Sequence, residues 1–117
     1  MSTFVEKIKM KHLTILVPDG NGNNLSSIVG TYKLFTKANE FYVKNGKKPV
    51  FAIQLAGTAK KVNYYDGLFS VKPHVNLASV KYTNLIIIPS LNHNYQKSIK
   101  ENKQSIDWIQ QDRKSVV

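Results

Sequence analysis

Cysteine is absent from the 117 residues of this chain. The sequence therefore offers no thiol nucleophile, no disulfide and no cysteine ligand for a metal. Long hydrophobic runs are absent as well, since no apolar stretch approaches the roughly 20 residues that span a membrane. The first residues, MSTFVEKIKMK, are too polar for a signal peptide. Together these absences predict a cytoplasmic protein that does not interact with membranes.

Arginine is scarce, and this limits what the positive charge of the chain can mean. The sequence has 17 Lys and Arg residues against 7 Asp and Glu, a formal net charge of +10. Only Arg113 could make the bidentate contacts that read guanine. The lysines are scattered rather than clustered, which is typical of a compositional bias. Direct nucleic-acid binding is therefore a hypothesis that only the net charge supports.

Short apolar runs alternate with a helical pattern in the first half of the chain. Residues 12–18 and 49–56 are apolar runs that predict buried strands of a parallel sheet. Between them, apolar residues recur at three- and four-residue spacing from Leu25, which predicts a helix of roughly 18–20 residues. Asn45-Gly46 has the composition of a helix end. The first half thus predicts strand, helix and strand in that order.

The second half adds a hairpin, a third strand and a further helix. Asp66-Gly67 is a turn dipeptide between two short apolar segments and predicts a β-hairpin. Residues 73–77 are expected to be irregular, whereas 85–89 is the most apolar run and predicts an interior strand. Apolar residues from Tyr95 onward predict a helix that is broken near Asn102. The final residues, 114–117, resemble the start of another strand.

This order of elements predicts an α/β fold with a parallel sheet, in which ligands bind beyond the carboxyl ends of the strands. Asp19 follows the first of these strands, and Ser90, Asn92 and His93 follow the strand at 85–89. Both loops are short and polar enough to line a pocket. The sequence therefore places its candidate binding site at this edge of the sheet.

Several segments resemble one known superfamily through their order and spacing. They are LTILVPDGNGN, SSIVGTYKLFTKAN, PVFAIQLAG, VNYYDGLFSVKPHVNL, NLIIIPS and SIDWIQQ. Together they resemble the ThiJ/PfpI domain, a glutamine-amidotransferase-like domain, in the form found at the N-terminus of AraC-type transcriptional regulators. The resemblance implies a flavodoxin-like three-layer sandwich with a mostly parallel sheet and a β-hairpin insertion. It covers residues 12–117, after an N-terminal extension at 1–11, and implies that the domain is cut before the strand that leads to the nucleophilic cysteine.

The sequence departs from the catalytic members of that superfamily at the positions that carry the chemistry. Ser27 stands where those members have an acidic residue early in the first helix, and Thr31 stands where they have a proline. Ser90 and Leu91 replace glycines whose backbone N–H groups serve an oxyanion-like hole. A serine does not exchange protons near neutral pH as a carboxylate does. We therefore expect a protein that is not an enzyme.

The resemblance then implies a domain that senses an effector and dimerises within a transcriptional regulator. DNA would be bound by a C-terminal pair of helix-turn-helix motifs that these residues do not include. The effector is an unknown small molecule, and the residues expected at its pocket are Asp19, Ser27, Ser90, Asn92 and His93. A homo-oligomer is expected, with its contact on the aromatic first helix or on an open flank of the strand at 85–89. The alternative is a fragment of a ThiJ/PfpI-type enzyme, such as a hydratase, peptidase or deglycase.

Metal and cofactor sites find little support in the residue pattern. His12, His74 and His93 are far apart in sequence and lack carboxylates at ligand spacing. The loop that starts at Asp19 lacks the bidentate glutamate of a calcium loop. Ser27 and Ser90 also have a structural interpretation as capping hydroxyls. We therefore predict neither a metal nor a cofactor.

Overall fold

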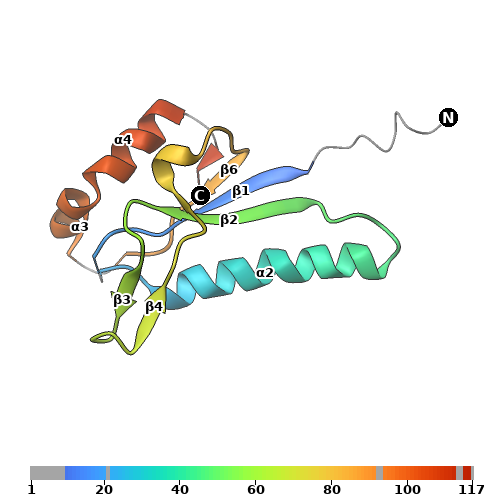
Figure 1. Ribbon diagram of the computed structural model, residues 1–117, viewed down its shortest axis with the longest axis horizontal. Coiled ribbons are helices and arrows are strands. Elements are labelled where there is room, and N and C mark those ends of the chain that lie inside the picture. Colours follow the sequence, from blue (N-terminus) through green and yellow to red (C-terminus); the bar gives the residue numbers. More distant parts are fainter. Residues whose placement is uncertain (1–9, 21, 92–93, 113–114, 117) are drawn as a thin grey trace.

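A computed structural model describes residues 10–20, 22–91, 94–112 and 115–116. Strands and helices alternate along the chain, as the apolar runs and helical spacing predict (Figure 1). The elements in chain order are β1 (Lys11–Leu16), α2 (Leu25–Lys44), β2 (Phe51–Gly57), β3 (Val62–Tyr64), β4 (Phe69–Val71), β5 (Val75–Asn76), the 3₁₀ helix η1 (Leu77–Ser79), β6 (Leu85–Ile87), α3 (Tyr95–Glu101), α4 (Lys103–Asp112) and β7 (Ser115–Val116).

Five strands form one parallel sheet in the order β5-β2-β1-β6-β7. The central strand β1 pairs with β2 along its whole length, from Lys11 opposite Phe51 to Leu16 opposite Ala56. Strands β3 and β4 form a separate antiparallel hairpin. The predicted fold class is confirmed, because the sheet is parallel and the hairpin lies between β2 and β5 in the sequence as a separate insertion.

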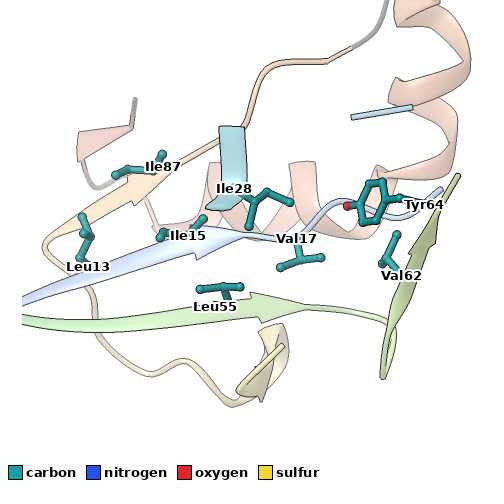
Figure 2. Close-up of a cluster of buried hydrophobic side chains, with 8 residues drawn as sticks. All are labelled: Leu13, Ile15, Val17, Ile28, Leu55, Val62, Tyr64 and Ile87. Atoms are coloured by element: carbon teal, nitrogen blue, oxygen red, sulfur yellow. The ribbon is translucent and has the colours of Figure 1, made fainter. Parts of the chain in front are cut away.

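Alternate residues of β1 face opposite sides of the sheet, and each side has its own core. Leu13 and Ile15 of β1, and Val17 directly after it, face the side covered by α2, where they join a cluster completed by Ile28, Leu55, Val62, Tyr64 and Ile87 (Figure 2). On the other side, Leu16 packs with Ala56 and Leu77, against which Trp108 and Ile109 of α4 are half-buried. This alternation follows from the period-two geometry of a strand. The result is the predicted three-layer sandwich, with α2 on one face and α3 and α4 on the other (Figure 1).

Helix α2 has clear local signals at both ends. The Asn24 side chain accepts a hydrogen bond from the Ser26 backbone N–H at 2.9 Å, which caps the start of the helix. At the far end, Asn45 is the C-cap and Gly46 has a φ of 76°, a conformation that glycine adopts without steric penalty. The predicted helix and its Asn45-Gly46 end are confirmed.

The hairpin turn is confirmed in its local geometry. Asp66 and Gly67 have φ values of 55° and 86°, and the Leu68 N–H donates to the Tyr65 carbonyl at 3.1 Å. Positive φ at both central residues is the signature of the turn that joins twisted antiparallel strands. The hairpin lies beside the start of α2 at the carboxyl edge of the sheet (Figure 1).

The structure corrects two expectations. The segment 73–77, expected to be irregular, contains β5, which pairs in parallel with Ala56 and Gly57 of β2. A strand of two residues is too short for an alternation pattern to reveal. The strand expected to have an open flank also has a neighbour, because Ser115 and Val116 of β7 pair with Leu85 and Ile86 of β6. In the described residues, no helix is long and apolar enough to cross a membrane.

Candidate functional site

Asp19 lies in the loop that leaves β1, and three contacts fix its position. The Asp19 N–H donates to Oδ1 of Asn102 at 2.6 Å, and Nδ2 of Asn102 donates back to the Asp19 carbonyl at 3.3 Å. The Thr58 hydroxyl donates to the Asp19 carboxylate. Both the backbone and the carboxylate of this predicted site residue are therefore held by elements distant in the sequence.

Asn102 occupies the break between α3 and α4, where the sequence predicts an interruption of the helix. Its Nδ2 also donates to the Ser98 carbonyl at 2.9 Å, so the side chain joins the end of α3 to the loop after β1. The residue is 8% exposed. The break in the helix thus presents an amide to the site, a role that the sequence did not indicate.

Asn23 and Tyr64 form a second buried link under the same loop. The Tyr64 hydroxyl donates to Oδ1 of Asn23 at 2.7 Å, and Nδ2 of Asn23 donates to the carbonyls of Pro18 and Gly20 at 3.4 Å each. Burial raises the pKa of the Tyr64 hydroxyl, and the hydrogen bond to Asn23 partly opposes this rise. Tyr64 therefore remains a neutral donor that ties the hairpin to the loop.

Ser27 and Ser90, two predicted site residues that are 63 positions apart, are in contact. The Ser90 N–H donates to the Ser27 hydroxyl oxygen at 3.2 Å. The Ser90 carbonyl accepts from the Asn24 N–H at 2.8 Å, and Asn23 forms an antiparallel bridge with Leu91. The start of α2 is thus attached to the segment after β6. Asn92 and His93, the remaining predicted site residues, lie outside the described residues.

Two carboxylates reach the carboxyl edge of the sheet. Gly20 has a φ of 79°, and a Cβ at this position would meet a carboxylate oxygen of Glu101 at 2.7 Å. Glu101, at the end of α3, therefore lies directly against the loop that contains Asp19. Sequence reasoning missed Glu101, because only the folded chain brings the end of α3 to this loop.

A shallow hollow opens beside Asp19, between the loop after β1 and the start of β3. Its volume is about 360 Å³, and Asp19, Lys61 and Asn63 supply its polar groups. A carboxylate, an ammonium and an amide are therefore available to one small molecule. Ser27 and Ser90 do not line this hollow.

The histidines of the described residues take structural roles. His12 lies at the start of β1, as expected, with its ring edge against Tyr82, and Nδ1 of His74 accepts from the Leu55 N–H at 2.9 Å. Within the part of the chain that the structure describes, no group of three or more His, Cys, Asp or Glu side chains could hold a metal ion.

Comparison with known proteins finds similarity to solved structures. No protein-family model matches the sequence. No curated protein matches it significantly. Solved structures do match it.

Three solved structures illustrate the likeness. A protein from Vibrio parahaemolyticus that is presumed to be a transcriptional regulator superposes with a TM-score of 0.72 at 21% identity, over 92% of this chain and 55% of that one. A ThiJ/PfpI family protein from Pseudomonas syringae gives 0.63 at 11% identity, over 93% and 41%. An AraC family transcriptional regulator from Pseudomonas putida gives 0.58 at 12% identity, over 86% and 59%.

The chain spans 41% to 59% of the length of these proteins. At such low identities the likeness concerns the fold. The Vibrio protein, the AraC family regulator and the ThiJ/PfpI family protein share with this chain the arrangement of the parallel sheet and its helices. The chain therefore has the fold of the ThiJ/PfpI domains.

Proposed function

We propose that this chain is a non-catalytic domain of an AraC-type transcriptional regulator, which senses a small molecule and dimerises. The fold supports this proposal, because two of the matching structures are named as regulators. In this proposal the protein acts in the cytoplasm, and DNA is bound by a helix-turn-helix domain outside these residues.

The contact between Ser27 and Ser90 is the observation that carries the non-catalytic part of the proposal. By resemblance, Ser27 stands at the position of a catalytic acid, and the Ser90 N–H belongs to the segment that serves an oxyanion-like hole. Here that N–H already donates to the Ser27 hydroxyl. A hydroxyl does not supply a proton near neutral pH, and a committed N–H is not free for a developing oxyanion. The two groups hold the loop together instead.

The hollow beside Asp19 is where we place the effector. Its volume of about 360 Å³ lies in the lower part of the range of small-molecule sites, which is about 300–1,000 Å³. Asp19 is held by Asn102 and Thr58, so its carboxylate is preorganised. With Lys61 and Asn63 on the wall, the hollow suits a small polar molecule that carries both an amino group and an acidic or carbonyl oxygen.

Self-association is proposed through α2. Of the residues of this helix, only Ile28 is buried. Leu34 and Phe41 are each 65% exposed, and a spacing of seven residues places them on one face of the helix. Exposed aromatic and aliphatic side chains on one face are typical of an interface. The first helix is favoured over the flank of β6, which pairs with β7.

An enzyme fragment is the second candidate, because Asp19 and Glu101 bring two carboxylates to one loop. Turnover assays with hydratase, peptidase and deglycase substrates separate the two candidates. We expect no activity above that of a heat-denatured control. Reproducible activity that is lost in Asp19→Asn or Glu101→Gln, but not in the surface variant Lys33→Ala, would establish the enzyme and refute the sensing domain.

A further inference from the structure

An open hollow lies between α4 and η1, on the face of the sheet opposite α2. Its volume is about 450 Å³, within the range of small-molecule sites, which is about 300–1,000 Å³. Thr58, directly after β2, and Asn76 of β5 line one side, and Gln104, Asp107, Trp108 and Gln111 of α4 line the other. This α4 hollow is distinct from the one beside Asp19, since the two share no lining residue.

The helix side of the α4 hollow is a single stripe of side chains. Gln104, Asp107, Trp108 and Gln111 follow the i, i+3, i+4, i+7 spacing that places residues on one face of a helix. The neighbouring face of α4 packs on the sheet through Ile109. Trp108 lies between the two faces, so it is half-buried against the core cluster and also lines the hollow. One indole is thus flanked by three polar side chains.

The polar groups of the wall include both donors and acceptors of hydrogen bonds. Gln104 and Gln111 are exposed, and each carries an amide oxygen and an NH₂ group. Oδ1 of Asn76 already accepts from a backbone N–H of η1 at 2.9 Å, so its NH₂ group is left to donate. The Thr58 hydroxyl donates to the Asp19 carboxylate, so its oxygen is left to accept. Because a hydroxyl group donates and accepts at once, a molecule with several hydroxyl groups matches this wall.

The charges around the α4 hollow favour a neutral ligand. Among the described residues that line it, Asp107 alone is charged. Its carboxylate pairs with the ammonium of Lys103, one turn earlier on the same helix, at 3.3 Å. The carboxylate would repel an anion, and a cation would compete with an ammonium that is already in place. A neutral hydroxyl group meets neither difficulty.

Trp108 supplies the aromatic part of the wall. An indole is a large apolar surface with a slightly negative face, so it packs well against C–H groups. A sugar ring carries C–H groups on its faces and hydroxyl groups around its edge. An open-chain polyol has the hydroxyl groups but no such rigid face. The combination of the indole with the surrounding amides therefore favours a ring sugar.

We propose that the α4 hollow binds a neutral monosaccharide, whose C–H groups pack against Trp108 and whose hydroxyl groups bond with the amides of Gln104 and Gln111. The Asp107 carboxylate accepts from a further hydroxyl group. The proposal rests on the α4 stripe and on the hydrogen-bonding capacity of the wall. It is independent of the effector hollow beside Asp19 and stands or falls separately.

Trp108 is the only tryptophan in the sequence, so its fluorescence reports directly on binding at the α4 hollow. The methyl glycosides of glucose, galactose and mannose are titrated into the 117-residue chain, since these sugars share the ring and differ in the orientation of one hydroxyl group. Sorbitol is the matched polyol without a ring. We expect a saturable change in Trp108 emission with at least one methyl glycoside, and no saturation with sorbitol.

Two neighbouring glutamines of α4 provide a variant and its matched control. Gln111→Ala removes an amide of the wall and should weaken glycoside binding about fivefold, the equivalent of about 1 kcal/mol for one hydrogen bond. Gln110→Ala removes an equally polar, exposed side chain that does not line the hollow, and should leave the affinity unchanged. Both positions are exposed and alanine is a strong helix former, so both variants should fold.

Three results would overturn the proposal. The first is the absence of a saturable change in Trp108 emission with all three methyl glycosides. The second is saturation by sorbitol at the same concentration as the glycosides, because the ring would then play no part. The third is an equal loss of affinity in Gln110→Ala and Gln111→Ala, which would mean that the sugar does not bind at the stripe of α4.

Discussion

Asn102→Ala should destabilise the domain more than its single side chain suggests. The substitution removes the acceptor of the Asp19 N–H and the donor to the Asp19 carbonyl, at 2.6 and 3.3 Å. The Ser98 carbonyl also loses one donor but keeps the Asn102 backbone N–H at 3.0 Å. Two backbone groups of Asp19 are therefore left without their partner.

The magnitude follows from the burial of these groups. An unsatisfied buried polar group costs about 1–3 kcal/mol, and Asp19 is half-buried, so water recovers part of this loss. We expect a loss of about 2–3 kcal/mol in the free energy of unfolding. For a domain of this size that corresponds to a fall of about 8–12 °C in Tm.

Urea unfolding followed by circular dichroism measures this loss, and Asn94→Ala is the matched control. Asn94 caps α3 with one exposed hydrogen bond, to the Lys97 N–H at 3.1 Å, and its loss should cost about 1 kcal/mol. If Asn102→Ala is no more destabilising than Asn94→Ala, the hydrogen bonds between Asn102 and Asp19 do not stabilise the loop after β1. The proposed preorganisation of Asp19 would then be refuted.

Two further predictions concern the same loop. Tyr64→Phe leaves Oδ1 of Asn23 without its donor and should cost about 1–3 kcal/mol near neutral pH. Burial raises the pKa of Tyr64 above its ordinary value in the folded chain, so the contribution of this hydroxyl to stability is complete below about pH 10 and is lost as the pH rises through the folded pKa. The free energy of unfolding should therefore fall less steeply above pH 10 in Tyr64→Phe than in the unmodified chain. Equal slopes of the free energy against pH, measured by urea unfolding, would contradict the burial of this hydroxyl. Gly20→Ala should cost about 1–2 kcal/mol, because φ is 79° and the new Cβ would meet Glu101. Gly30→Ala, in open space on α2, should instead stabilise the domain by about 0.4–1 kcal/mol. Thermal unfolding measures both variants, and Tm shifts of the same sign in Gly20→Ala and Gly30→Ala would contradict this prediction.

Local signals in the sequence were sufficient for most of the fold. Apolar runs identified β1, β2 and β6, the Asn45-Gly46 pair identified the end of α2, and Asp66-Gly67 identified the hairpin. Each of these signals is contained within a few consecutive residues. The two-residue strand β5 was missed, because its partner on β2 is what makes it a strand.

The candidate site was only partly predictable. The rule that ligands bind beyond the carboxyl ends of parallel strands pointed to Asp19 and Ser90, and the family resemblance pointed to Ser27. Neither line of reasoning could show that Ser27 contacts Ser90, or that Glu101 of α3 and Asn102 just after it reach the loop after β1. These contacts join residues more than 60 positions apart, and no local pattern encodes them. Asn92 and His93 remain predictions.

Self-association through α2 is the part of the proposed function that one measurement tests most directly. Sedimentation equilibrium at micromolar concentration should give about twice the chain mass of 13.3 kDa. Leu34→Lys and Phe41→Lys, which place charges on the exposed face of α2, should shift the protein toward the monomer. Tyr65→Lys, an equally exposed position on the hairpin, should leave the dimer intact. A stable monomer of 13.3 kDa for the unmodified chain would contradict the dimerising domain proposed for this fold.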